Sequence, residues 1–272
     1  MNTTQIPPAP MLKLAAKEAM QKSGTAITKV TLVYIGLSLV VNYALQGTIP
    51  EDKYLLGLAL AMIINLLLNL VQFGYQGTCL DCARGEEELP VAGLLAGTHL
   101  PLRVFGLYIL SNLLVFVQGF PYMLAMILAS ALLSFLGVFG ILLMVPVAIW
   151  YIWSVAKVAA RYILAPMVLW DRPEMPAMDC LNLSRTMMQG HEGKYIWLIV
   201  SFIGWLLAVA LTMGIASMYV TPYMGVTLAM FYRALGGDKI AGLAQKTEDN
   251  TQQSDGLKDA FTTSAYRDSE DN

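Results

Sequence analysis

The chain has 272 residues, of which 57% are hydrophobic and 13% are charged, whereas about 25% of the residues in an average soluble domain are charged. The formal net charge is −2, and no basic face is concentrated enough for a nucleic-acid-binding protein. These values exclude an ordinary soluble domain and indicate a membrane protein that binds no nucleic acid.

Charged residues are absent from four long windows, which are 30–50, 54–80, 104–156 and 195–232. A bilayer core about 30 Å thick takes roughly 20 apolar residues of helix to cross, and lipid offers no partner for open backbone groups. The first two windows are long enough for one crossing each and the last two for two. We therefore predict an all-α fold, a polytopic membrane helix bundle with six transmembrane helices.

Lysine and arginine are divided unevenly between the two ends of these helices. Lys53 is the only one of the 17 Lys and Arg residues on the side opposite the N-terminus. Because cytoplasmic loops carry the excess of positive charge, both termini are predicted to be cytoplasmic. No apolar run of about 7–15 residues opens the chain, so we expect no cleavable signal peptide.

In chain order, residues 1–25 are expected to form a cytoplasmic lead with a short, weakly amphipathic helix over 10–23. The membrane domain is expected over 26–240. Residues 241–272 are polar, so a disordered cytoplasmic tail is predicted there. The six predicted transmembrane helices lie at about 27–47, 54–77, 102–118, 122–156, 195–213 and 217–235.

Two turns divide the long windows. Gly214 lies near the middle of the last window and marks one turn. In the window 104–156, the residues that favour a turn gather at 118–122, where Gly119 and Pro121 stand close together. The alternative is a turn near Pro146 that leaves a long third helix.

The second predicted helix carries a stripe of four amide side chains at helical spacing. A similar stripe in the first helix includes Thr31, Tyr34 and Ser38. Because an amide that faces lipid is costly, the stripes are expected to face one another and to hydrogen-bond across the bundle. They serve either as packing contacts alone or as the lining of a polar path or cavity. The four amides are Asn65, Asn69, Gln72 and Gln76.

Three cysteines occur, and Cys79 and Cys82 form a C-x-x-C pair at the cytoplasmic end of the second helix. The separations from Cys180 and the two histidines match no compact zinc knuckle. We therefore expect reduced thiols, no metal site and no cofactor. No phosphate loop, metalloprotease or nucleophile-elbow motif occurs, so the chain is not expected to be an enzyme.

The segment 184–232 carries the most specific pattern. It reads S-R-T-M-M-Q-G-H, then S-F-I-G-W, T-M-G-I, P-Y and A-M-F-Y. This order resembles a bacterial family of uncharacterised integral membrane proteins found mostly in Gram-positive bacteria, domain-of-unknown-function family nine-seven-five. Glu192 and Ala216 replace a Lys and a Gly of the family pattern. The motif residues singled out are Ser184, Gly190, His191, Gly204, Trp205, Pro222 and Tyr223.

The resemblance implies a six-helix membrane protein, similar in plan to the membrane domain found ahead of some glycerophosphodiester phosphodiesterases, and it implies no reaction. Physically, Gly190 is expected to end a cytoplasmic helix and to turn the chain into the fifth transmembrane helix. Gly204 is expected to let a neighbouring helix approach closely, while Trp205 fills the bundle.

A basic cluster is predicted where the fourth helix ends and the fifth begins. At the depth of lipid phosphates its members are candidates to bind the anionic inner leaflet; otherwise they only anchor the helix ends. The candidate lipid-headgroup residues are Lys157, Arg161, Arg185, His191 and Lys194.

Three classes of function follow from these features. The leading hypothesis is a non-enzymatic multi-pass protein of the bacterial cytoplasmic membrane that acts in envelope or lipid homeostasis through membrane lipids or protein partners. The alternative is a permease or export component for a small amphipathic solute or peptide, which would use the polar stripes. An enzyme acting on lipid headgroups ranks last, because no acid–base or metal constellation is visible.

Overall fold

The computed structural model describes residues 6–48, 54–134 and 138–239, and every regular element in these ranges is a helix. The predicted all-α class is confirmed, whereas the predicted tail, 241–272, lies outside the described residues. In chain order the elements are α1 (Ala9–Lys22), α2 (Ala26–Thr48), α3 (Tyr54–Arg84), the 3-10 helix η2 (Val91–His99), α4 (Pro101–Ser134), α5 (Val138–Ala160), α6 (Ala165–Asp171), α7 (Ala177–Met188), α8 (Glu192–Val200), α9 (Ile203–Leu211) and α10 (Ser217–Ala234).

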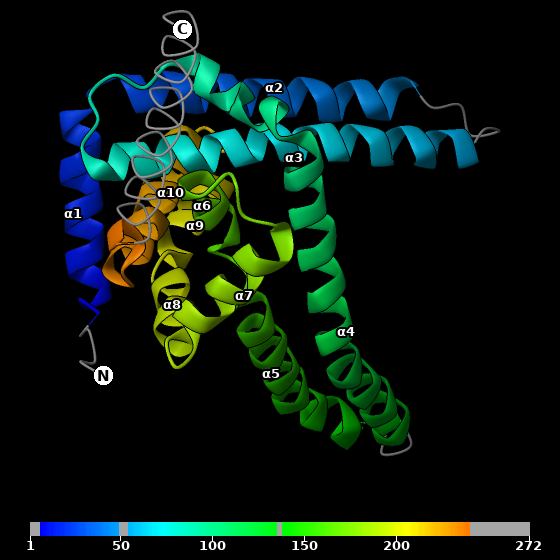
Figure 1. Ribbon diagram of the computed structural model, residues 1–272. Coiled ribbons are helices and arrows are strands. Elements are labelled where there is room, and N and C mark those ends of the chain that lie inside the picture. The colour runs from blue at the N-terminus through cyan, green and yellow to red at the C-terminus, as the bar shows by residue number, and fades with distance from the viewer. Residues whose placement is uncertain (1–5, 49–53, 135–137, 240–272) are drawn as a thin grey trace, which may run out of the picture.

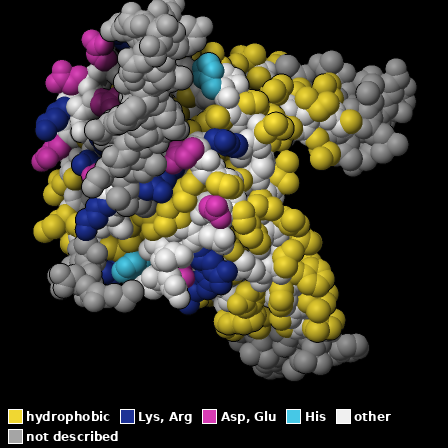
Figure 2. All heavy atoms as spheres, viewed as in Figure 1, with side chains coloured by type: hydrophobic (Ala, Val, Ile, Leu, Met, Phe, Trp, Pro, Cys, Tyr) yellow, Lys and Arg dark blue, Asp and Glu magenta, His cyan; other side chains and the backbone are white. Residues whose placement is uncertain are grey.

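Two long helical hairpins project from the rest of the molecule in different directions (Figure 1). Helices α2 and α3 pack along each other in one hairpin, and α4 and α5 in the other. Hydrophobic side chains predominate on the described part of both hairpins in this view (Figure 2). Helices α9 and α10 form a third, shorter pair. The outward faces of these hairpins are suited to lipid, because they carry large apolar side chains without charge.

The remaining helices, α1, η2, α6, α7 and α8, gather where the hairpins meet, and we call this region the body (Figure 1). The largest buried side chains belong to it and to the adjoining hairpin ends, for example Leu169, Leu181, Met188 and Phe231. Charged side chains also lie over the body (Figure 2). The core and the charged groups of the described residues therefore share one end of the hairpins.

Helix α1 is held against the protein by its apolar side. Leu12, Ala16 and Ala19 are buried, and the helix packs on α3, α8 and α10. The chain then bends by 97° into α2, where Gly24 has a φ of 55°, a left-handed conformation that glycine adopts without steric cost. The predicted lead helix is thus present, and it is part of the packed body.

Four helical stretches of the described residues are long and apolar enough to cross a membrane, and the bent pair α1–α2 makes a fifth if it counts as one span. The chain therefore has the helices of a multi-pass membrane protein. The four stretches are Ala59–Arg84, Pro101–Ala131, Met144–Asp171 and Glu192–Leu211.

The predicted turn at 118–122 is wrong, and so are the predicted helices 102–118 and 122–156. Helix α4 runs without a break from Pro101 to Ser134, with Pro121 inside it, and α5 begins at Val138. The alternative turn near Pro146 is also wrong, because Pro146 lies inside α5. A proline removes one backbone hydrogen bond, but ending a helix in apolar surroundings would expose several backbone groups.

The fifth predicted helix, 195–213, begins earlier than expected and is broken in the middle. Helix α8 ends at Val200 and α9 begins at Ile203. The Lys13 ammonium of α1 donates a hydrogen bond to the Ser201 carbonyl oxygen at 2.8 Å and lies 3.9 Å from the centre of the Phe202 ring. A cation at this point offsets the negative end of the α8 dipole.

The predicted turn at Gly214 is confirmed. Helix α9 ends at Leu211 and α10 begins at Ser217, while Met213 and Gly214 have φ values of 51° and 95°. Met213 is 96% exposed at the tip of this hairpin. The tip presents an apolar side chain to its surroundings, as the hairpin flanks do.

Candidate functional site

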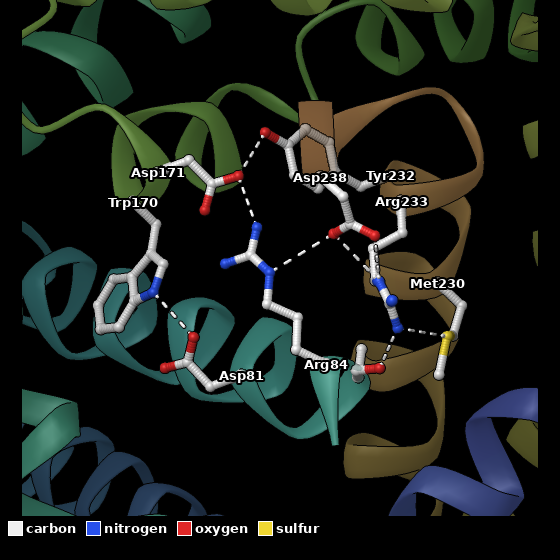
Figure 3. Close-up of polar contacts among 9 residues, drawn as sticks. Asp81, Arg84, Trp170, Asp171, Met230, Tyr232, Arg233 and Asp238 are labelled. Atoms are coloured by element: carbon white, nitrogen blue, oxygen red, sulfur yellow. Dashed lines mark hydrogen bonds and ion pairs between the residues drawn. The ribbon is translucent and has the colours of Figure 1, made fainter. Parts of the chain in front are cut away.

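A buried carboxylate joins three helix ends in the body. Asp171 ends α6 and is 2% exposed, and it accepts a hydrogen bond from Arg84 Nη2 of α3 at 2.8 Å. The same oxygen accepts a hydrogen bond from the Tyr232 hydroxyl of α10 at 2.9 Å. The three side chains converge in Figure 3. Such charge-assisted bonds are stronger than neutral ones.

Further polar contacts extend this centre, which we call the ionic network. Trp170 Nε1 donates to Asp81 at 3.2 Å, and Arg84 Nε lies 3.6 Å from Asp238. Arg233 pairs with Asp238 at 2.9 Å and donates to the Ala83 carbonyl oxygen (Figure 3). The network therefore ties the chain after α10 to the ends of α3 and α6. Its members are Asp81, Arg84, Trp170, Asp171, Tyr232, Arg233 and Asp238.

A glycine in α3 allows α6 to approach closely enough for these bonds. A Cβ atom at Gly77 would overlap the ring of Trp170, so the indole lies directly on the α3 backbone. Asp81 and Arg84 follow one and two helical turns later, on the side that meets α6. The residues of α6 from Ala165 to Leu169 are all buried, which fixes Trp170 and Asp171 in place.

The network connects the ends of α3, α6 and α10. Each charged side chain in it has an opposite charge or a hydrogen-bond donor beside it. Within the described ranges, no three His, Cys, Asp or Glu side chains are grouped to hold a metal ion. The arrangement fixes the positions of α3, α6 and α10 relative to one another. A displacement of one of these helices would therefore strain the hydrogen bonds to the other two.

The three cysteines are free and buried, and they lie in different surroundings. Cys79 packs against Gly225 of α10, and Cys82 Sγ donates to the Ser23 hydroxyl at 3.5 Å. Burial, reinforced by the nearby Asp179 and Glu174 carboxylates, raises the pKa of the Cys180 thiol to about 11. A thiol with that pKa stays protonated and unreactive at neutral pH.

The candidate lipid-headgroup residues lie around the start of α8, and the structure brings two of their helices together. Helix α5 packs against α8, and Arg161 Nε lies 3.4 Å from the Glu192 carboxylate. Arg185 and Lys194 are exposed, while Lys157 is exposed and lies 5.3 Å from the Trp153 ring centre. His191 is half-buried, and its Nδ1 has no hydrogen-bond partner.

The C-terminal half of the amide stripe in α3, Gln72 and Gln76, faces α4. The prediction that it faces α2 is wrong. Gln72 and Gln76 line a small pocket with α4 side chains. Asn69 is half-buried, and exposed Asn65 donates at 3.1 Å to the Ala61 carbonyl oxygen of its own helix. Toward α2, the contact is made instead by Tyr75, whose ring stacks on Tyr34 and whose hydroxyl lies 3.2 Å from Thr31 Oγ1.

The comparisons with known proteins give one match. A family model described as a protein of unknown function (DUF975) matches residues 10–239. The chain belongs to this family. No curated protein and no solved structure matches it. The matched residues span from α1 to the end of the ionic network, so both the network and the basic cluster lie inside the family domain.

The first half of the family motif shapes the entry to α8. The Ser184 hydroxyl donates to the Arg161 carbonyl oxygen at 2.8 Å, which joins α7 to the end of α5. Gly190 follows α7 with a φ of 80°, as predicted, and its N–H donates to Glu192 at 3.0 Å. His191 precedes α8 as its N-cap residue.

The second half of the motif departs from the expected packing. Nothing would lie within 4 Å of a Cβ atom at Gly204, so the prediction of a close helix contact there is wrong. Trp205 is exposed on one side and lies against the rings of Tyr219 and Tyr223, at 5.7 and 5.9 Å. Pro222 and Tyr223 are buried inside α10. Gly204 is exposed and lies on a side of α9 that contacts no other helix of the described residues.

The ionic network was not predicted from the sequence. Asp81 and Arg84 stand three residues apart after an apolar window, a spacing that places both on one helix face. Tyr232 ends another such window, and Arg233 follows it directly. Charged and polar residues at the ends of apolar windows were therefore the available signal, although the sequence does not tell which of them pair.

Proposed function

We propose that the protein is a non-catalytic multi-pass component of the bacterial cytoplasmic membrane that acts in envelope or lipid homeostasis through anionic lipids or protein partners. The observation that carries the proposal is the division of the molecule into apolar hairpins and a charged body. The exposed basic side chains of Arg185 and Lys194 support a contact with lipid phosphates, since each adds attraction to an anionic leaflet.

The proposed topology has six crossings in three hairpins, with both termini on the cytoplasmic side. Its support is that α2–α3, α4–α5 and α9–α10 each pack as a pair and that each pair returns the chain to the body (Figure 1). The strong excess of Lys and Arg on the body side supports the proposed orientation.

A reporter that is active only in the cytoplasm tests this topology. We expect activity when it is fused after Asn272 or inserted at Glu87, because the proposed topology assigns both positions to the cytoplasmic side. Insertion at Asp52, beside the lone Lys53, should give none. Cytoplasmic activity at Asp52 would contradict the orientation, and an inactive fusion after Asn272 would mean an odd number of crossings.

The lipid contact is tested by changing Arg185 and Lys194 together to Gln. Both side chains are exposed, so the fold should be retained. Each basic residue near an anionic surface contributes about 1 kcal/mol, so we expect binding of anionic phospholipid to weaken by roughly 30-fold. Native mass spectrometry of protein released from vesicles with equal amounts of phosphatidylglycerol and phosphatidylcholine measures this.

Lys17 and Lys22, which are also exposed but lie on α1, supply the matched control. Changing both to Gln removes the same charge and should leave the bound anionic lipid nearly unchanged. If both double variants lost the same amount of bound anionic lipid, the loss would be explained by net charge and not by a site at Arg185 and Lys194. Unchanged lipid binding after Arg185→Gln with Lys194→Gln would limit the cluster to anchoring the helix ends.

A further inference from the structure

A second polar site lies between α3, α4 and the segment that links α5 to α6, separate from the basic cluster. It is a pocket of about 140 Å³. Asn112 and Ala159, which line it, are exposed, so the pocket opens to the outside of the protein. Leu107, Val115 and Pro166 supply apolar wall. The polar residues of the lining are Gln72, Gln76, Tyr108, Ser111, Asn112 and Tyr162.

Two hydrogen-bonding groups of this lining lack a partner among the described residues. The Gln76 Oε1 atom and the Tyr108 hydroxyl are buried without one. Buried polar groups are nearly always paired in folded proteins, because an unpaired one has lost its bonds to water without replacement. The Tyr162 hydroxyl accepts a hydrogen bond from Gln118 Nε2, which leaves its own proton to donate. The pocket thus offers both an acceptor and donors.

The pocket lining is uncharged, since it contains no Asp, Glu, Lys, Arg or His side chain. The nearest cation in the chain of hydrogen bonds is Arg161, which donates to Gln118 Oε1 at 3.4 Å and pairs with Glu192. An ionised ligand would lose its hydration without meeting an opposite charge. A hydroxyl group both donates and accepts a hydrogen bond, so a polyol fits this mixture of groups.

We propose that this pocket binds an uncharged polyhydroxyl group, such as a glycerol or sugar unit, with Gln76 and Tyr162 as its hydrogen-bonding partners. The carbon skeleton of the ligand would lie against the apolar wall. The group is carried either by a lipid headgroup or by a free polyol. This site takes a neutral ligand, so it is independent of the anionic lipid contact at Arg185 and Lys194.

Thermal unfolding of the full-length protein in a zwitterionic detergent tests the proposal. Three probes are compared: 1-monooleoylglycerol, which bears two hydroxyls on a lipid, oleyl alcohol, which bears one, and free glycerol. For the wild type we expect monooleoylglycerol at saturation to raise the Tm by about 5 °C more than oleyl alcohol. A shift of that size with glycerol alone, lost with Gln76→Leu, would assign the site to free polyols.

Gln76→Leu should abolish the shift while leaving the ligand-free Tm equal or higher, because a buried amide oxygen without a hydrogen-bond partner is removed. Asn65→Leu is the matched control from the same stripe, and it should keep the full shift. Tyr162→Phe, which removes only the hydroxyl, serves if Gln76→Leu does not fold. An equal shift in Gln76→Leu and wild type, or no shift of the wild type with monooleoylglycerol or glycerol, would overturn the proposal.

Discussion

Asp171→Ala should lower the free energy of unfolding by about 3 kcal/mol, because it removes the buried carboxylate of an ion pair and leaves Arg84 with only the more exposed Asp238 as a charged partner. Arg84 is 23% exposed, so water relieves part of this cost. The Tyr232 hydroxyl loses its acceptor as well. Reversible unfolding in detergent, followed by tryptophan fluorescence, measures the change, and Trp170 beside Asp171 reports on the same region.

Two other variants of the ionic network serve as controls. Asp171→Asn keeps the shape and an acceptor for Tyr232, so it should cost less than Asp171→Ala. Asp238 is 47% exposed where it meets Arg84 and Arg233, and exposed pairs contribute about 1 kcal/mol or less. A loss in Asp238→Ala as large as in Asp171→Ala would show that the network is not centred on Asp171.

Gly74→Ala should destabilise the protein by about 2–3 kcal/mol through overpacking. A methyl group at Gly74 in α3 would overlap the carbonyl oxygens of Gly93 and Leu94 in η2. These are backbone atoms, so no side chain can turn away to make room. Gly97 meets the α3 backbone at Leu70 in the same manner, and η2 would have to shift as a whole.

Gly119→Ala is the matched control, and its effect should have the opposite sign. Gly119 lies inside α4, and nothing would lie within 4 Å of a Cβ atom there. Alanine in a helix interior is favoured over glycine by about 0.5–1 kcal/mol, so the Tm should rise slightly. Equal destabilisation by both substitutions would contradict the close contact between α3 and η2.

The parts of the fold that the sequence predicts are those that lipid and local geometry determine. Apolar windows without charge mark the hairpins, because a charged side chain has no favourable place in lipid. Gly190 and Gly214 mark turns, because both adopt a positive φ. These signals depend on the residue and its near neighbours, so they can be read without knowing what packs against them.

The features of the fold that the sequence does not predict depend on tertiary contacts. Asp171 meets Arg84 across 87 residues and Tyr232 across 61, and no local pattern selects those partners among the charged helix ends. Gly119 and Pro121 favour a turn in water, yet α4 continues through both. Gly204 was assigned to a helix contact because of its size, whereas in the structure it is exposed and no atom of the described residues would lie within 4 Å of a Cβ atom there. In each case the environment outweighed the residue's intrinsic preference.

In the described residues, the hairpins α2–α3 and α4–α5 contact the rest of the protein at one end, and toward the other end the two helices of each hairpin pack mainly on one another. When the hydrophobic length of a spanning helix differs from the thickness of the bilayer core, the helix tilts or the bilayer deforms. The free-energy cost is small for each ångström of mismatch. Each hairpin can therefore lean separately, with its pivot near the pocket between α3 and α4. A change in bilayer thickness would then change the angle between the two hairpins, and with it the shape of that pocket.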